Sequence, residues 1–160
     1  MKPHIKEKLQ KLKNSTTNLQ LTSGRLKTIP SELKTCPNLK YLDLFGNSIQ
    51  TIPDWFFQLK LLENLSLKNN SIKDFPTIIF TLEKLTSINL SGNQINDVTD
   101  HQFADLMSID KVDISYNSIK AINFKKVECP KCTNLNMKGN NLEKFPKAIS
   151  QIKTLEKLDL

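Results

Sequence analysis

Apolar residues and asparagine recur along this chain with a rhythm that fits neither a helix nor a continuous strand. Between residues 39 and 52 the repeated positions stand 3, 2, 3, 2 and 3 residues apart. Leu42 and Leu44 are two residues apart, so they lie on one face of a short strand. Leu39 and Ile49 lead into and out of that strand and point into the same interior. The spacing therefore predicts a short strand followed by a turn at Asn47.

The same pattern occurs seven times, and successive copies begin 23 residues apart except for one interval of 24. The copies begin at Thr16, Leu39, Leu62, Leu85, Ile109, Cys132 and Leu155. One copy cannot bury its apolar face alone, so neighbouring copies must stack to make a continuous core. The repeat therefore predicts a solenoid in which each coil contributes one parallel strand.

The repeat resembles that of the leucine-rich repeat family, whose pattern is L-x-x-L-x-L-x-x-N-x-L. The second half of several copies adds an apolar residue and a proline, as in Ile29-Pro30, Ile52-Pro53, Phe75-Pro76 and Phe145-Pro146. That half is similar to the 23-residue intracellular subclass of Ras-suppressor-like proteins and to small leucine-rich repeat-containing proteins. The resemblance implies an α/β solenoid, a horseshoe with a parallel concave sheet and an irregular or helical convex side.

An asparagine occupies the turn after the strand in the second to sixth copies, whereas the first copy has Gly24 there. These asparagines are Asn47, Asn70, Asn93, Asn117 and Asn140. A buried side-chain amide can bond backbone groups that the turn leaves unpaired. We therefore expect the five side chains to stack as a ladder along the solenoid.

Residues 1–15 precede the repeats and differ from them. Ile5, Leu9 and Leu12 follow the i, i+4, i+7 spacing of one apolar helix stripe. Because the first coil of a solenoid needs a cover, the stripe predicts a capping helix over 1–15, with repeats over 16–160 and an incomplete last copy. The segment also contains five lysines and one glutamate, so a basic helix on an anionic membrane is the alternative.

The copy that begins at Leu85 is one residue longer than the others, and its tail lacks the proline. Asp100 precedes the apolar residues Phe103 and Leu106, which predicts at least one helical turn capped by Thr99 or Asp100. The next tail also lacks the proline, and Val127 stands one place off register. The convex side is therefore expected to be irregular near residues 99–129.

One sequence motif is also found in active sites. Cys129 and Cys132 are three residues apart, which is the spacing of a redox pair or of half a zinc site. Both, however, occupy positions where other copies have leucine. Cys36 would lie four coils away, at roughly 19 Å, too far to complete a site. We therefore expect structural cysteines, no metal and no cofactor.

Charge and histidine content argue against several functions. His4 and His101 have no nucleophile or metal-ligand partner at a recognisable spacing, so neither an enzyme nor a small-molecule substrate is predicted. The net charge is +7, but the chain has a single arginine and lacks the basic, aromatic-interleaved face of a nucleic-acid binder. An odd count of three cysteines and the lack of a secretory signal indicate the cytoplasm.

Alternate strand residues point away from the core onto the concave sheet. Three exposed rows are predicted, which run through Asn18 and Tyr41, through Gln20 and Asp43, and through Thr22 and Phe45. Tyr41 and Phe45 are the only aromatic residues of these rows and belong to one strand, which suggests an interface anchor with a polar rim. The candidate partner-binding residues are Tyr41, Asp43, Phe45, Asn64, Lys68, Asn89, Lys111 and Asp113.

The repeats and the resemblance together predict a non-enzymatic scaffold or adaptor that binds a protein on its concave face. One alternative is the recognition module of a longer signalling enzyme whose catalytic part lies beyond residue 160. The other is a membrane-surface adaptor that uses the basic helix over 1–15.

Overall fold

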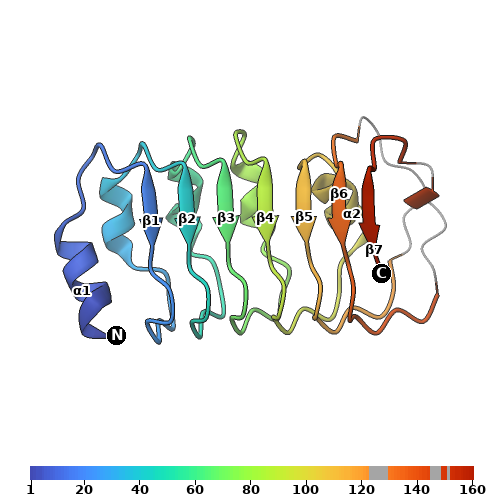
Figure 1. The fold of residues 1–160 in the computed structure, drawn as a ribbon, viewed down its shortest axis with the longest axis horizontal. Coiled ribbons are helices and arrows are strands. Elements are labelled where there is room, and N and C mark those ends of the chain that lie inside the picture. Colours follow the sequence, from blue (N-terminus) through green and yellow to red (C-terminus); the bar gives the residue numbers. More distant parts are fainter. Residues whose placement is uncertain (123–129, 145–148, 151) are drawn as a thin grey trace.

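The computed structural model describes residues 1–122, 130–144, 149–150 and 152–160. Seven parallel strands form one open sheet in sequence order, one strand per coil (Figure 1). The strands are β1 (Asn18–Gln20), β2 (Tyr41–Asp43), β3 (Asn64–Ser66), β4 (Ser87–Asn89), β5 (Lys111–Asp113), β6 (Asn134–Asn136) and β7 (Lys157–Asp159). The predicted α/β solenoid with a parallel sheet is therefore confirmed.

The strand register follows the repeat without a shift. Tyr41 of β2 pairs with Asn18 of β1 and with Asn64 of β3, and Asp43 pairs with Gln20 and Ser66. The same alignment continues to β7. The central residue of each strand from β1 to β6 is buried, so the flanking residues face the other side of the sheet. We call that exposed side of the sheet the concave face.

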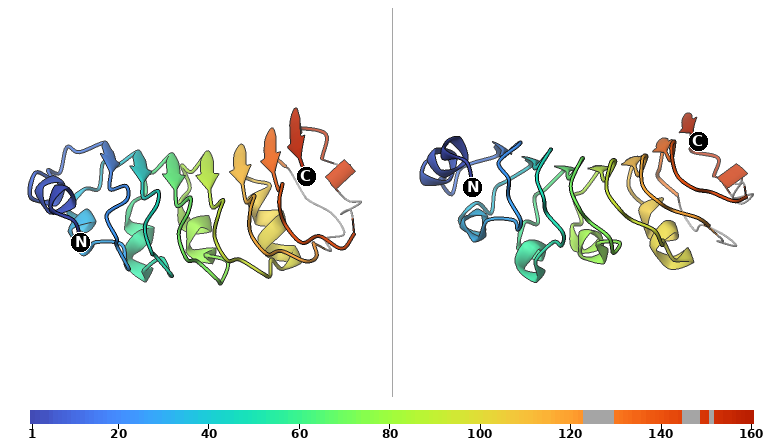
Figure 2. Two further views of the ribbon diagram at one scale, coloured as in Figure 1. Left: turned by 60° about the horizontal axis from the view of Figure 1, so that its bottom comes forward. Right: turned by 90° about the horizontal axis from the view of Figure 1, so that it is seen from below.

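Within the described part of the chain, three short 3-10 helices lie on the side of the stack opposite the strands (Figure 2). They are η1 (Ser31–Thr35), η2 (Asp54–Gln58) and η3 (Thr77–Thr81), and each begins directly after a proline. Proline fixes φ and donates no backbone N–H, which suits the residue just before a helix rather than a second sheet. Each helix buries one apolar residue, namely Leu33, Phe56 and Ile79.

The longer fourth coil has a regular helix, α2 (Asp100–Leu106), on this convex side. Thr99 caps it: its hydroxyl accepts from Gln102 N at 3.3 Å, and Gln102 Oε1 accepts from Thr99 N at 2.8 Å. This capping box confirms the predicted helix and selects Thr99 over Asp100 as the cap. Val127 and Phe145-Pro146, on which two predictions depended, lie outside the described residues.

The predicted asparagine ladder is present, and each amide joins two coils. Asn93 Oδ1 accepts from Ile72 N at 3.0 Å, and Asn93 Nδ2 donates to Leu67 O at 3.0 Å and to Leu90 O at 2.9 Å. Equivalent bonds occur at Asn47, Asn70, Asn117 and Asn140. We call these five side chains the Asn ladder. It satisfies backbone groups that the turns leave unpaired.

Helix α1 (Pro3–Gln10) covers the first coil and buries Ile5 and Leu9. These residues belong to the stripe that a membrane-bound helix would present to lipid. Their burial explains why Gly24 replaces asparagine, since a Cβ at residue 24 would lie 2.6 Å from Ile5 Cγ1. The boundary between a cap over 1–15 and repeats over 16–160 stays a prediction.

The same helix shields the outer edge of the sheet. Leu21 N donates to Asp43 O at 2.8 Å, so the backbone groups of Gln20 and Thr22 point away from β2. Lys8 Nζ donates to Gln20 O at 2.8 Å, and His4 Nε2 lies 3.3 Å from Thr22 O. Side chains of α1 thus occupy carbonyls that a foreign strand would otherwise bond.

Cys36 and Cys132 are fully buried free thiols, as the structural interpretation predicted, and Cys129 lies outside the described residues. Burial raises the pKa of the Cys132 thiol to about 11. Within the described ranges, no three His, Cys, Asp or Glu residues come together as a metal site would require. None of the described helices is long and apolar enough to cross a membrane.

Candidate protein-binding surface

The two predicted aromatic anchors lie on the coil of β2. Tyr41 is half-buried at the start of the strand, and Phe45, two residues past its end, has 36% of its surface exposed. Asp43 lies between them, and its Oδ1 accepts from Phe45 N at 3.0 Å. This Asx turn uses one carboxylate oxygen to hold the backbone that presents Phe45. Tyr41 is therefore less exposed, and Asp43 less free, than the sequence predicted.

Asn64 and Lys68 extend this group onto the next coil. Asn64 pairs with Tyr41 in the sheet and is half-buried, whereas Lys68 is exposed. Gly46 N donates to Lys68 O at 3.0 Å, which holds the two coils together beside Phe45. The structure thus brings together five of the eight predicted residues, and we call them the aromatic cluster: Tyr41, Asp43, Phe45, Asn64 and Lys68.

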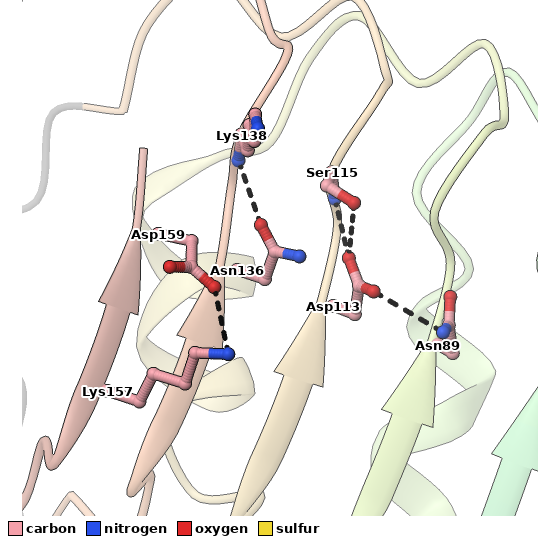
Figure 3. A network of polar contacts seen from close by, with 7 residues as sticks. All are labelled: Asn89, Asp113, Ser115, Asn136, Lys138, Lys157 and Asp159. Carbon is pink, nitrogen blue, oxygen red and sulfur yellow. Dashed lines mark hydrogen bonds and ion pairs between the residues drawn. The ribbon is translucent and has the colours of Figure 1, made fainter.

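The other three predicted residues, Asn89, Lys111 and Asp113, lie on β4 and β5. Asn89 and Asp113 belong to a polar network on the concave face (Figure 3). Asp113 Oδ1 accepts from Ser115 N at 3.0 Å, and Asn89 Oδ1 accepts from Ser91 N at 2.9 Å. Asn89 Nδ2 also donates to Asp113 Oδ2 at 3.4 Å. Asn136 makes the same turn with Lys138 N at 3.1 Å. We call Asp43, Asn89, Asp113 and Asn136 the Asx row.

The third predicted row is only partly exposed, which corrects the sequence analysis. Ser91 and Ser115 occupy the positions of Phe45 in their coils, but each has only 2% of its surface exposed. Their hydroxyls donate to Asn89 Oδ1 and Asp113 Oδ1 at 2.6 Å. These hydrogen bonds hold the two serine side chains beneath Asn89 and Asp113. Phe45 has no hydroxyl to make such a bond, and its side chain is exposed.

Sequence analysis missed Tyr116, which has 58% of its surface exposed. It occupies the position just before the ladder asparagine, and every described residue at this position has a positive φ: Ser23, Gly46, Asn69, Gly92, Tyr116 and Gly139. Tyrosine at a φ of 50° is uncommon. Its ring lies over Gly139, where a Cβ would be 2.7 Å from Tyr116 Cδ1. The sequence feature that could have identified Tyr116 is a tyrosine at a position where three other copies have glycine.

The chain belongs to the leucine rich repeat family, whose sequence profile matches residues 14–72, 61–119 and 83–142. These overlapping matches span most of the stack that carries the aromatic cluster and the Asx row. Proteins of this family are generally protein-interaction modules. None of the curated protein sequences compared with the chain matches it.

Solved structures with the same fold include a leucine-rich repeat protein of Leptospira interrogans and an internalin of Listeria monocytogenes. The first is 27% identical with a TM-score of 0.69, and the alignment covers 92% of this chain and 43% of that one. The second is 20% identical with a TM-score of 0.71, and the coverage is 92% and 42%. The chain thus spans less than half the length of either structure.

Proposed function

We propose that this protein is a non-enzymatic interaction scaffold that binds a protein partner on its concave face through the aromatic cluster. The observation that supports this most directly is the exposure of Phe45 on the coil that also carries Tyr41, on a face whose other outward residues are mostly polar. Binding energy in protein interfaces concentrates on a few large side chains, with aromatic residues over-represented and polar residues around them. The cluster has this composition, since the polar residues Asp43, Asn64 and Lys68 lie on the same two coils as the two aromatic residues.

The scaffold supports such an interface because its backbone is held from both sides. The Asn ladder bonds the turns from the core, and Asp43 bonds the turn that precedes Phe45. A surface held in this way loses little conformational entropy when a partner binds. The proposal includes a cytoplasmic location and the 23-residue intracellular subclass, to which the proline-led convex segments and the buried thiols are suited.

The recognition module of a longer protein is compatible with the same surface. The leptospiral protein and the internalin are each more than twice as long as the part of them that aligns with this chain. In that arrangement the aromatic cluster would select the partner, and another part of the protein would act on it. The mutations that test the scaffold test this function equally.

The experiment begins by capturing binding proteins with the immobilised wild-type chain and purifying the strongest one. Calorimetry then measures its affinity for single variants whose unfolding temperatures have been checked. Tyr41→Ala and Phe45→Ala should each weaken binding by about 1–3 kcal/mol. Asn134→Ala, on the same face but four coils from Tyr41, is the matched control and should be nearly silent.

A different result would move the site to the convex side. Trp55 is half-buried there, next to Phe56 and 5.7 Å below the ammonium of Lys34. If Trp55→Ala abolished the complex while Tyr41→Ala and Phe45→Ala left the affinity unchanged, concave-face binding would be wrong.

A further inference from the structure

A groove lies at the corner between α1 and the concave face, next to the aromatic cluster. Its volume is about 620 Å³, within the roughly 300–1,000 Å³ range of ligand pockets. Lys8, Lys11 and Leu12 form the wall on the side of α1, and Asn18, Gln20 and Tyr41 form the floor. Figure 2 shows α1 at the end of the sheet beside β1. Asn18, Gln20 and Tyr41 are outward residues of β1 and β2, so the groove opens onto the same surface as the proposed partner site.

The groove has a fixed positive charge at its rim. Lys8 Nζ is held at 2.8 Å from Gln20 O, so this ammonium group is positioned before any partner arrives. Lys11 lies at the rim as well, but Glu7 pairs with it at 2.6 Å. Asp43, next to Gln20 in the sheet, is the other nearby acid. Lys8 and Lys11 are the charged residues among those that line the groove, so its wall on the side of α1 is cationic.

Apolar side chains line the groove together with polar groups that could bond a peptide backbone. Leu12 packs against the core, Leu19 is buried below the groove, and the Tyr41 ring is half-buried. The side-chain amides of Asn18 and Gln20 are exposed and make no hydrogen bond to the described residues. Such amides can both donate and accept. The groove therefore fits one large apolar side chain whose neighbours are negatively charged.

We infer that the partner of the concave face presents an acidic segment with a large apolar side chain, and that this segment binds in the groove between α1 and β1. Tyr41 belongs to both the groove and the aromatic cluster, so one partner can occupy both. The inference rests on the proposed function, because it specifies the chemistry of the partner at the same surface. Complementary charge of this kind contributes mainly to specificity and to the rate of association.

The test uses three blocked peptides, EEWEE, SSWSS and KKWKK, added to the isotope-labelled full chain and followed by the shifts of backbone amide resonances. We expect EEWEE to shift residues 8–20 and 41 in a saturable way. SSWSS should bind the same residues about tenfold more weakly, and KKWKK should not bind there. Raising the NaCl concentration from 0.05 to 0.3 M should weaken EEWEE several-fold and leave SSWSS nearly unchanged.

Lys8→Met should weaken EEWEE about five- to tenfold, and Lys84→Met, an exposed lysine on another coil, should leave it unchanged. The salt dependence is measured on the wild-type chain, so it remains informative if Lys8→Met loosens α1. Equal binding of EEWEE and SSWSS, shifts centred on other coils, or no saturable shift would overturn the inference. In that case the proposed function would still stand if the affinity of the purified partner fell in the Tyr41→Ala and Phe45→Ala variants, and only the assignment of the groove would be wrong.

Discussion

Two sets of polar side chains bond the same turns of this solenoid from opposite sides. The Asn ladder lies on the core side and reaches between coils, as Asn93 does to Leu67 and Ile72 of the preceding coil. The Asx row lies on the concave face and mostly bonds within its own coil, two residues ahead, as Asp113 does to Ser115. The two sets have nearly the same chemistry but differ in burial and in reach.

The difference indicates which set holds the fold and which shapes its surface. A buried amide that is removed leaves its backbone partners without water to replace it, whereas an exposed turn can bond solvent instead. The ladder should therefore carry much more of the stability than the Asx row. The Asx row has a local task, because its bonds decide how the following side chain is presented to a partner.

The largest effect should come from breaking the ladder at its centre. Asn93→Ala would leave the N–H of Ile72 unpaired in the core and would remove one of the two ladder amides that donate to each of the carbonyls of Leu67 and Leu90. The expected cost is about 1–3 kcal/mol. Unfolding in urea measures this loss. Asn64→Ala is the matched control, since Asn64 lies on the concave face and its side chain bonds none of the described residues. Equal unfolding midpoints for the two variants would contradict the comparison.

A smaller loss is expected where the turn needs a left-handed residue. Gly92 has a φ of +64°, and a Cβ there would lie 2.0 Å from Asn69 Oδ1. Gly92→Ala should cost about 1–2 kcal/mol, from backbone strain and from displacement of the Asn69 side chain. The double variant Asn69→Ala, Gly92→Ala should be less destabilised than the sum of the two single variants. Strict additivity in urea unfolding would show that the two side chains do not meet.

Within the Asx row, the loss of stability on mutation should depend on whether the hydrogen-bond partner of each residue is buried. Asn89→Ala removes the acceptor for both N and Oγ of the buried Ser91, and should cost about 0.5–1.5 kcal/mol. Asp43→Ala removes one bond to the backbone of the exposed Phe45 and should cost within about 0.5 kcal/mol. Thermal unfolding measures the stability of both variants. A larger fall in unfolding temperature for Asp43→Ala than for Asn89→Ala would contradict this interpretation.

The smallest expected effect is on local opening of the structure near Asn140, the last residue of the Asn ladder. Burial raises the pKa of Cys132 from 9.0 to about 11, which lowers its thiolate fraction at pH 8 about 100-fold and should make alkylation slow. Asn140 is only half-buried, so Asn140→Ala should speed alkylation of Cys132 by at most about fivefold. Asn136→Ala, from the Asx row, should not change it. Mass spectrometry of the tryptic peptide that begins at Cys132 measures the rate, and an equal acceleration by Asn136→Ala would remove the distinction.

The sequence by itself determined the period of the coils, the register of the strands and the identity of the Asn ladder. It also predicted at least one helical turn after Thr99 or Asp100, from the spacing of Phe103 and Leu106, and the structure has α2 there. These features could be predicted because the same sequence pattern recurs in every coil. A strand of alternating burial, a turn at asparagine and a proline before the convex segment have the same meaning in every copy.

Only the tertiary structure decided how side chains of neighbouring coils share space on the surface. Tyr41 is half-buried beside a groove formed with α1, Ser91 and Ser115 turn beneath the Asx row, and Tyr116 lies over Gly139. Lys8 and His4 reach the outward carbonyls of Gln20 in β1 and of Thr22 just after it, which no spacing along the chain indicates. The two serines bond residues only two positions away. The other outcomes depend on contacts between residues about 23 positions apart, or between α1 and the sheet. Periodicity says which face a residue occupies, whereas packing against a neighbour decides how much of that face remains free to bind.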